Sequence, residues 1–273
     1  MATDSSILRF ENVNLHFGEV PALVNLSFGM GPGETLVVMG AAGSGKTMLL
    51  KSAMGLVKPD SGRVFLLDQE ITSLQESQMF DIRSNVGILF QEGGLFDSLT
   101  VAENVAYPLL YQPRHAVLSQ NGSVDQKVRE ALRFVELEHT LNKFPSELSG
   151  GMRRRVGIAR AIVTEPALVL YDSPTAGLDP ITANTIISLI IKQRDLHNTA
   201  AIMVTYRYQD GHLMANFRYN PNSGEVERVT PEGAVENLLK TEFMIMNEGR
   251  EVFEGPQGEL TTFPDRYVQK FVR

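Results

Sequence analysis

One glycine-rich stretch of the chain reads Gly40-Ala41-Ala42-Gly43-Ser44-Gly45-Lys46-Thr47. It satisfies the pattern G-x-x-x-x-G-K-[ST], in which glycines let the backbone curl so that successive N–H groups point inward at an anion. We expect Lys46 to reach the β- and γ-phosphates of a nucleotide and the Thr47 hydroxyl to bind magnesium. The stretch therefore predicts a cradle for ATP and Mg²⁺.

The residues on either side of the cradle supply the expected context. Thr35 to Met39 form a short, apolar run typical of a buried strand, and Lys46 to Leu56 reads as a helix. A helix that starts at the cradle points its positive dipole end toward bound phosphate. The alternative is a chance glycine turn before a helix, and the order strand, loop, helix argues against it.

Further strands are predicted along the chain. Buried-strand patterns occur at Val86 to Phe90, Ala167 to Tyr171 and Ala200 to Thr205. Because helical stretches alternate with them, we expect an α/β fold with a mainly parallel sheet and helices on both faces. Two β-rich stretches, Ile7 to Phe17 and Val20 to Met30, open the chain and predict an antiparallel β subdomain.

The middle of the chain is helical in pattern. Thr100–Glu103 and Ser123–Gln126 read as capping boxes, which start helices. The second is followed by apolar residues at helical spacing, namely Val124, Val128, Ala131, Leu132 and Val135. We therefore interpret residues 1–273 as one domain, with a core formed by 1–95 and 160–273 and a helical lobe formed by 95–160.

A last stretch, residues 207–235, reads as an inserted β-hairpin. Leu213 to Tyr219 is the expected first strand, Asn220 to Gly224 the turn, and Glu225 to Val229 the return strand. The hairpin is expected to extend the sheet edge or to cover the nucleotide-side interface. The alternative is a surface insertion of no consequence.

The composition excludes several classes of function. A formal net charge of -7 and a pI of about 5.3 argue against a nucleic-acid-binding protein. The absence of cysteine excludes disulfides, thiolate metal sites and thiol catalysis. The opening MATDSSILRF lacks the basic and apolar regions of a signal peptide. The sequence contains no run of about 20 apolar residues, so it predicts no membrane span. We therefore expect any membrane role to come through a partner.

A carboxylate follows one of the predicted strands. The run Leu168-Val169-Leu170-Tyr171 is apolar and ends in Asp172. A strand of this kind presents its terminal carboxylate at the edge of the sheet, beside the phosphates, where Asp172 can hold the magnesium shell. An isolated strand end is the alternative, and the cradle at 40–47 favours the metal role.

The segment Leu148-Ser149-Gly150-Gly151-Met152 resembles the signature motif of ABC ATPases. It begins 20 residues before Leu168, as that family places it. The resemblance implies a P-loop ABC-ATPase fold that works as a homodimer. It also implies that Ser149, Gly150 and Gly151 bind the γ-phosphate held by the opposite subunit.

Other residues match functional positions of the same family. Gln91 matches the Q-loop glutamine, which touches magnesium and senses the membrane partner. Asp179, within Ala176 to Pro180, matches the D-loop at the dimer interface, and Phe17 matches the aromatic that stacks on adenine. A core or edge-strand role is the alternative for Phe17. The run Arg153 to Arg155 is interpreted as a solvated helix face rather than a phosphate site.

Within the family, the chain is most similar to the ATPases of Mla/MCE-type phospholipid transporters in double-membraned bacteria. The similarity rests on Leu89–Phe96, Glu103–Leu109, Pro145–Met152 and Asp179–Thr182. It implies an integral membrane permease as partner, with contacts from Gln91 through Tyr107, and an MCE-domain substrate-binding protein. It further implies a lipid substrate and a location on the cytoplasmic face of the inner membrane.

Two positions depart from the family. The usual Asp-Glu-Pro-Thr reads Asp172-Ser173-Pro174-Thr175 here, and the histidine expected after the Ala200 to Thr205 strand is Tyr206. A serine cannot accept a proton as a carboxylate does, and general-base catalysis contributes about 10²–10⁴-fold. We therefore expect the chain to bind MgATP and dimerise but to hydrolyse ATP slowly. Ser173, Tyr206 and Gln91 occupy the catalytic positions.

Three alternatives stay open at this point. The chain can be a hydrolysis-poor regulatory subunit gated by nucleotide, as Ser173 and Tyr206 favour. It can be an ABC protein of DNA repair or translation, against which the acidic pI argues. It can also be a P-loop small-molecule kinase, against which the signature and D-loop motifs argue.

Overall fold

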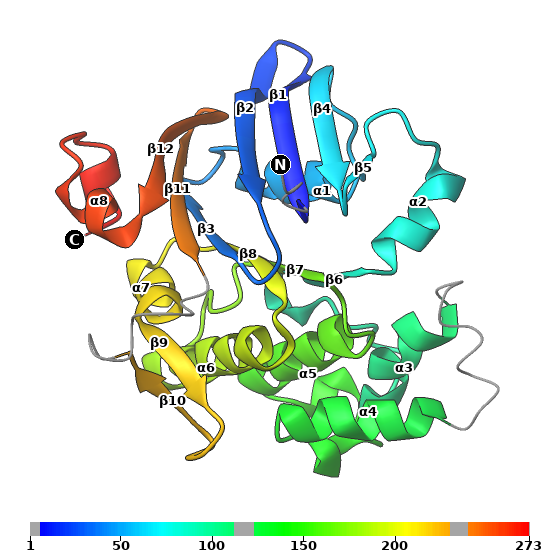
Figure 1. Ribbon diagram of the computed structural model, residues 1–273. Coiled ribbons are helices and arrows are strands. Elements are labelled where there is room, and N and C mark those ends of the chain that lie inside the picture. Colours follow the sequence, from blue (N-terminus) through cyan, green and yellow to red (C-terminus); the bar gives the residue numbers. More distant parts are fainter. Residues whose placement is uncertain (1–5, 112–122, 230–239, 273) are drawn as a thin grey trace.

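The central sheet of the computed structural model, which describes residues 6–111, 123–229 and 240–272, has the strand order β12-β11-β3-β8-β7-β6 (Figure 1). All neighbours in it are parallel except β11 and β12, which confirms the expected mainly parallel sheet. Its strands are β3 (Thr35–Gly40), β6 (Val86–Leu89), β7 (Leu168–Asp172), β8 (Ala200–Val204), β11 (Thr241–Asn247) and β12 (Arg250–Pro256).

A second sheet has the order β2-β1-β4-β5 and is antiparallel throughout. Its strands are β1 (Leu8–Phe17), β2 (Val20–Met30), β4 (Ser61–Leu66) and β5 (Gln69–Glu70). Its inward residues share one apolar core with β3 and α1 (Lys46–Ala53), which the buried side chains of Phe10, Val38 and Leu49 represent. The expected antiparallel β subdomain therefore packs directly against the cradle.

Helix α1 is shorter than the sequence predicts. It ends at Ala53 rather than Leu56, because Gly55 has a φ of 63° and takes the chain out of the helix. A glycine in the left-handed region is a common way for a helix to end. The backbone N–H of Leu56 then donates to the carbonyl of Lys51 over 2.9 Å and closes the last turn.

The helical lobe lies below the central sheet in Figure 1 and contains α3 (Val101–Tyr111), α4 (Ser123–Phe134) and α5 (Gly150–Ile162). The predicted capping box of α3 is present, because the Thr100 N–H donates to the Glu103 carboxylate over 2.7 Å and Thr100 Oγ1 accepts from the Glu103 N–H over 3.3 Å. Helix α4 begins at Ser123 as expected, although the side chain of Ser123 lies outside the described part. Its predicted apolar stripe is buried except for Val124, which is half-buried, and α4 contacts both α3 and α5.

Helices α2 (Glu76–Arg83), α6 (Pro180–His197) and α8 (Gln257–Thr262) complete this framework, with short 3-10 turns at Gln91–Gly93, Glu138–Thr140, Pro145–Glu147 and Val268–Lys270. Among the described residues, we find no helix with both the length and the apolar character that crossing a bilayer requires.

The inserted hairpin is shorter than predicted. Residues 213–216 belong to helix α7 (Tyr208–Asn216), so the strand expected from Leu213 is wrong there. Asp210, Gly211 and Met214 are all buried, a helical spacing that places α7 on the sheet. Only β9 (Phe217–Asn220) and β10 (Glu225–Arg228) form the hairpin, which packs against α6. Residues 230–235 of the predicted insertion lie outside the described residues.

Candidate nucleotide site

The cradle joins the end of β3 to the start of α1, as expected. Gly40 and Gly45 have φ values of 152° and 102°, which favour glycine. A Cβ at Gly40 would collide with the backbone oxygen of Met246, and one at Gly45 with that of Ala22. The loop is therefore curled tightly between the two sheets, with Ala41, Ala42, Gly43 and Thr47 exposed on its open side.

Lys46 folds back over this loop. Its Nζ donates to the carbonyl oxygens of Gly40 (2.8 Å) and Ala41 (2.7 Å) and to Ser44 Oγ (3.1 Å). Burial lowers the pKa of Lys46, and the negative charge of Asp172 opposes that shift. The ammonium group thus lies at the mouth of the cradle and within electrostatic reach of Asp172.

Asp172 ends β7 at the same edge of the sheet. Burial raises the pKa of its carboxyl, while the hydrogen bond from Ser173 and the charges of Lys46 and Lys51 act in the opposite direction. In the sheet, Leu89 pairs with Tyr171 and Asp172 pairs with Val204. The residues that follow these strands, Gln91 and Tyr206, therefore lie at the edge that also carries the cradle.

Ser173 has a strained backbone, with φ at 52°. Its N–H donates to the Val204 carbonyl over 2.9 Å, and its Oγ lies 3.3 Å from Asp172 Oδ1. Tyr206, two residues after Val204, is 56% exposed. Neither side chain offers a carboxylate or an imidazole at this edge.

Arg154 is a residue whose role the sequence analysis missed, and its assignment to a solvated face was wrong. Only 5% of it is exposed. Its guanidinium donates to the carbonyl oxygens of Ser173 (3.2 Å), Pro174 (2.7 Å) and Ala176 (2.7 Å). Arg154 lies four residues before the buried Ile158 on α5, and that helical spacing could have indicated its inward position.

Asp210 holds the same turn from the other side. Its Oδ2 accepts from Thr175 Oγ1 (2.5 Å) and Thr205 Oγ1 (2.7 Å), and its side chain is almost fully buried. Burial raises the pKa of Asp210, which the two hydroxyl hydrogen bonds and the charge of Arg207 oppose. The turn at 173–176 is therefore clamped between α5 and α7.

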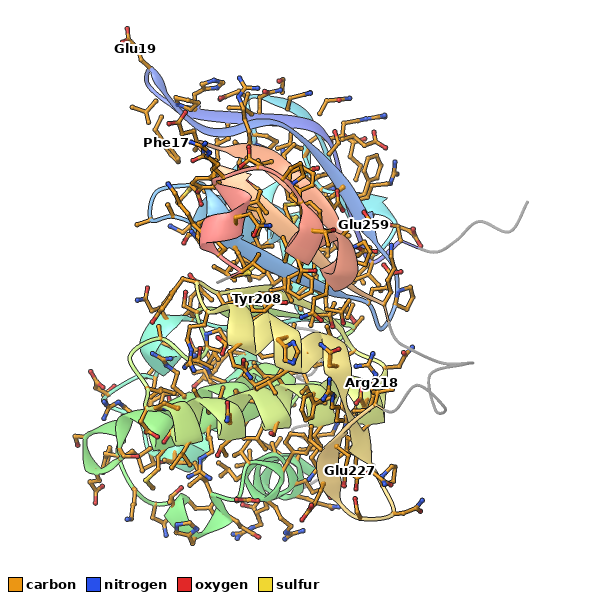
Figure 2. All side chains as sticks on the ribbon, turned by 90° about the vertical axis from the view of Figure 1, so that its left-hand side faces the viewer. Phe17, Glu19, Tyr208, Arg218, Glu227 and Glu259 are labelled. Carbon is orange, nitrogen blue, oxygen red and sulfur yellow. The ribbon has the colours of Figure 1, made fainter. Side chains whose placement is uncertain are left out.

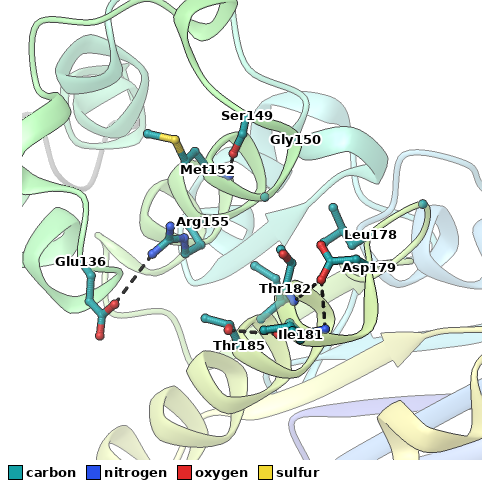
Figure 3. A pocket seen from close by; sticks show the side chains of 13 residues that line it. Glu136, Ser149, Gly150, Met152, Arg155, Leu178, Asp179, Ile181, Thr182 and Thr185 are labelled. Atoms are coloured by element: carbon teal, nitrogen blue, oxygen red, sulfur yellow. Dashed lines mark hydrogen bonds and ion pairs between the residues drawn. The ribbon is translucent and has the colours of Figure 1, made fainter.

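The signature segment forms a separate surface (Figure 3). Ser149 caps α5, because its Oγ accepts from the Met152 N–H over 3.2 Å, and Gly150 beside it is exposed. Asp179 caps α6, and its Oδ1 accepts from the N–H groups of Ile181 and Thr182 at 3.0 Å each. These two helix starts line a hollow of about 570 Å³ together with Gly151.

Phe17 lies at the far end of β1, next to the turn that carries Glu19 (Figure 2). It is 54% exposed, which removes the core alternative for this aromatic. An exposed ring at the end of a strand can offer a flat apolar face to a base.

The parallel sheet, the cradle at its edge and the helical lobe with its signature surface together define an ATPase cassette. Residues 23–176 match the family described as ABC transporter, and the chain belongs to this family as an ATP-binding subunit. Family membership removes the kinase alternative. The predicted ABC-ATPase fold is confirmed, because solved ATP-binding cassettes are similar to the chain in structure.

Two solved structures are similar over most of the chain. One is the dimeric structure of a post-hydrolysis state of an ATP-binding cassette bound to ADP and Pi, with a TM-score of 0.72, 27% identity and coverage of 91% of this chain and 98% of that one. The other is cbiO1 from Clostridium perfringens, part of the ABC transporter complex cbiONQ, with a TM-score of 0.74, 25% identity and coverage of 98% and 94%.

Relatives of different transport function are similar to about the same degree. The intermembrane phospholipid transport system ATP-binding protein MlaF of Haemophilus influenzae is 32% identical over 88% of each chain. The methionine import ATP-binding protein MetN of Clostridium tetani is 31% identical over 89% of this chain and 77% of its own. The chloroplastic protein TRIGALACTOSYLDIACYLGLYCEROL 3 of Arabidopsis thaliana is 35% identical over 99% and 75%.

Proposed function

We propose that the chain binds MgATP in the cradle Gly40–Thr47 and couples its binding and turnover to transport through a membrane permease. The observation that carries this proposal is the tight loop at the end of β3, with the Lys46 ammonium at its mouth and Asp172 within electrostatic reach. In this proposal Phe17 stacks on the adenine. The core is residues 1–95 with 160–273, and the lobe is 95–160.

The magnesium shell belongs to Thr47, Gln91 and Asp172. These side chains present a hydroxyl, an amide and a carboxylate, and oxygen donors of this kind are what Mg²⁺ prefers. They come from α1, from the turn after β6 and from the end of β7, which share one edge of the sheet. A bound divalent cation favours the ionised carboxylate of Asp172 against the effect of its burial.

Titration of the full chain with MgATP tests the proposal. We expect saturable uptake for the natural chain and a loss of at least about tenfold in affinity for Lys46→Ala, because one ammonium–phosphate contact is worth about 1.5–3 kcal/mol. Lys58→Ala is a matched control, because Lys58 donates to the Leu74 carbonyl away from the cradle. No uptake, or equal uptake by Lys46→Ala, contradicts the proposal.

We further propose a homodimer in which the surface of Ser149, Gly150, Gly151 and Asp179 faces the cradle of the second copy. This surface is hollowed and exposes Gly150 and Asp179. The similar cassette with bound ADP and Pi is described as dimeric. A twofold pair of this kind places each nucleotide between one cradle and one signature surface.

The permease is proposed to dock on an exposed hydrophobic surface made by four aromatic residues and one leucine: Phe90, Phe96, Tyr107, Leu110 and Tyr111. All five are at least 37% exposed. The ring centroid of Tyr107 lies 4.7 Å from that of Phe96 and 4.5 Å from that of Tyr111. A hollow of about 320 Å³ opens beside them. Exposed apolar patches of this kind mark interaction sites, and the permease places the chain on the cytoplasmic face of the inner membrane.

Phospholipid is the proposed cargo class, with an MCE-domain protein as a further partner. The support is the likeness to MlaF over 88% of both chains. Co-purification from detergent-extracted membranes, followed by analysis of bound lipid, tests this proposal. Recovery of a methionine-binding partner instead would favour the relationship to MetN. Recovery without any membrane protein would favour a role in DNA repair or translation.

A second candidate function is a nucleotide-gated subunit with little turnover. The specific observation is the absence of a carboxylate side chain at Ser173 and of an imidazole at Tyr206, while the cradle and Asp172 are intact. A steady-state ATPase assay separates the two candidates.

A further inference from the structure

The C-terminal segment of the chain reaches the cradle. The residues after α8 lie beside that helix, on the β12 side of the central sheet in Figure 1. The Tyr267 hydroxyl accepts a hydrogen bond from the Ala41 N–H over 3.1 Å and donates to the Met246 carbonyl over 3.0 Å. Ala41 is the second residue of the cradle, and Met246 pairs with Gly40 in the sheet. One side chain thus joins the start of the cradle to β11.

The tyrosine is held in place by its own segment. The N–H groups of Tyr267 and Val268 donate to Asp265 Oδ1 over 2.7 and 3.1 Å. Val268 is fully buried, and the ring of Tyr267 packs edge-on against Phe271 with centroids 5.1 Å apart. The hydroxyl is therefore directed at the cradle by several contacts that do not involve the cradle.

The start of this C-terminal segment is hydrogen-bonded to helix α7, which follows Tyr206. Gln257, the first residue of α8, donates from Nε2 to the Tyr208 hydroxyl over 2.7 Å and accepts from Asn216 Nδ2 over 2.6 Å. Figure 2 shows Tyr208 at the level where the sheets meet the helices. The C-terminal segment thus bridges α7 and the cradle.

Tyr267 and Lys46 both form hydrogen bonds with Ala41 of the loop. Lys46 Nζ bonds the carbonyl oxygens of Gly40 and Ala41, whereas Tyr267 takes the N–H of Ala41. A phosphate that engages the ammonium group competes for these carbonyl contacts. The tyrosine contact lies on the N–H side and can persist, so it keeps the start of the loop in register with β11.

We propose that Tyr267 is a positioning residue that preorganises the cradle for nucleotide from the C-terminal segment. This inference rests on the proposed binding of MgATP at Gly40–Thr47. Preorganisation increases affinity because less ordering of the loop remains to be done on binding.

The test measures MgATP affinity of the full chain by calorimetry. Tyr267→Phe keeps the ring and its contact with Phe271 but removes both hydrogen bonds of the hydroxyl. We expect its Kd for MgATP to rise about three- to tenfold, the effect of one net hydrogen bond. Tyr219→Phe is the matched control, since Tyr219 lies on β9 of the hairpin and takes no part in the contacts of the C-terminal segment described above; its Kd should equal that of the natural chain.

The possible outcomes distinguish the positioning role of Tyr267 from the proposed binding of MgATP. If the natural chain binds MgATP and Tyr267→Phe binds equally well, the positioning role is wrong while the proposed function stands. If the natural chain takes up no MgATP, both are wrong. Should Tyr267→Phe fail to fold, hydrogen exchange of the natural chain decides, because reciprocal coupling requires residues 264–272 to gain protection when MgATP binds. Unchanged exchange there overturns the inference.

Discussion

Ser173 stands beside Asp172 at the edge of the sheet, where it ties two strands together without supplying a base. Its N–H donates to the Val204 carbonyl of β8, and its hydroxyl lies 3.3 Å from the Asp172 carboxylate. A hydroxyl in that position adds a hydrogen bond to the proposed metal ligand but takes no proton from water at neutral pH. We therefore expect substitutions at Ser173 to change hydrolysis more than nucleotide binding.

We predict that Ser173→Glu combined with Tyr206→His raises ATP turnover by about tenfold or more, because a general base contributes about 10²–10⁴-fold. Steady-state phosphate release measures the change. Ser173→Gln with Tyr206→His is the matched control, with nearly the same shape and no carboxylate, and it should gain little. A natural chain that already hydrolyses as fast as the double variant would show that another group acts as the base.

At the scale of elements, helices α5 and α7 both hold the turn after β7 through hydrogen bonds. The Arg154 guanidinium bonds three carbonyl oxygens of that turn, while Asp210 of α7 bonds Thr175 from the other side. Since α5 starts at the signature segment and α7 follows Tyr206, these contacts connect both helices to the turn that begins at Ser173.

Arg154→Ala should therefore destabilise the fold by about 2–4 kcal/mol, because one buried and two part-buried carbonyl oxygens lose a charged donor. Urea unfolding of the nucleotide-free chain, compared at equal m-value, measures this loss. Arg153→Ala is the control from the same run of arginines. Arg153 is half-buried and, within the described part of the chain, donates to one carbonyl oxygen, that of Leu148, so its cost should stay below about 1 kcal/mol. Equal costs for the two variants would refute the clamp.

The elements and motifs that depend on neighbours in the chain were predictable. The strand before Gly40, the helix after it and the capping box at Thr100 all follow from patterns a few residues long. Contacts between distant segments left no such pattern. Ala41 and Tyr267 are 226 positions apart, and Asp210 meets Thr175 across 35. Their pairing depends on how the sheet orders its strands, which local periodicity does not encode.

Two errors have the same origin. The run Arg153 to Arg155 is expected on a solvated face, yet Arg154 is buried and faces the turn after β7. The segment from Leu213 is expected as a strand, whereas burial of Gly211 and Met214 against the sheet makes it the end of α7. In both places tertiary packing overrides composition.

At the scale of the whole molecule, the cradle and the signature surface form two half-sites, each of which we propose to be completed by a second copy. The slow hydrolysis that Ser173 and Tyr206 predict would make this assembly visible, because bound MgATP would then keep the pair closed. We predict that MgATP doubles the mass of the natural chain in light-scattering measurements, and that ADP does not.

The variant Gly150→Glu tests this dimer. It places a negative charge where we propose that the γ-phosphate held by the second copy lies. It should keep the chain monomeric, with its MgATP affinity unchanged. The substitution is compatible with the fold, since a Cβ at Gly150 meets its nearest atom, in Leu178, at 3.9 Å. Glu19, at the tip of the β1–β2 turn in Figure 2, supplies the control through Glu19→Gln, which should dimerise normally. If Gly150→Glu still doubles its mass with MgATP, the two half-sites do not meet across the dimer.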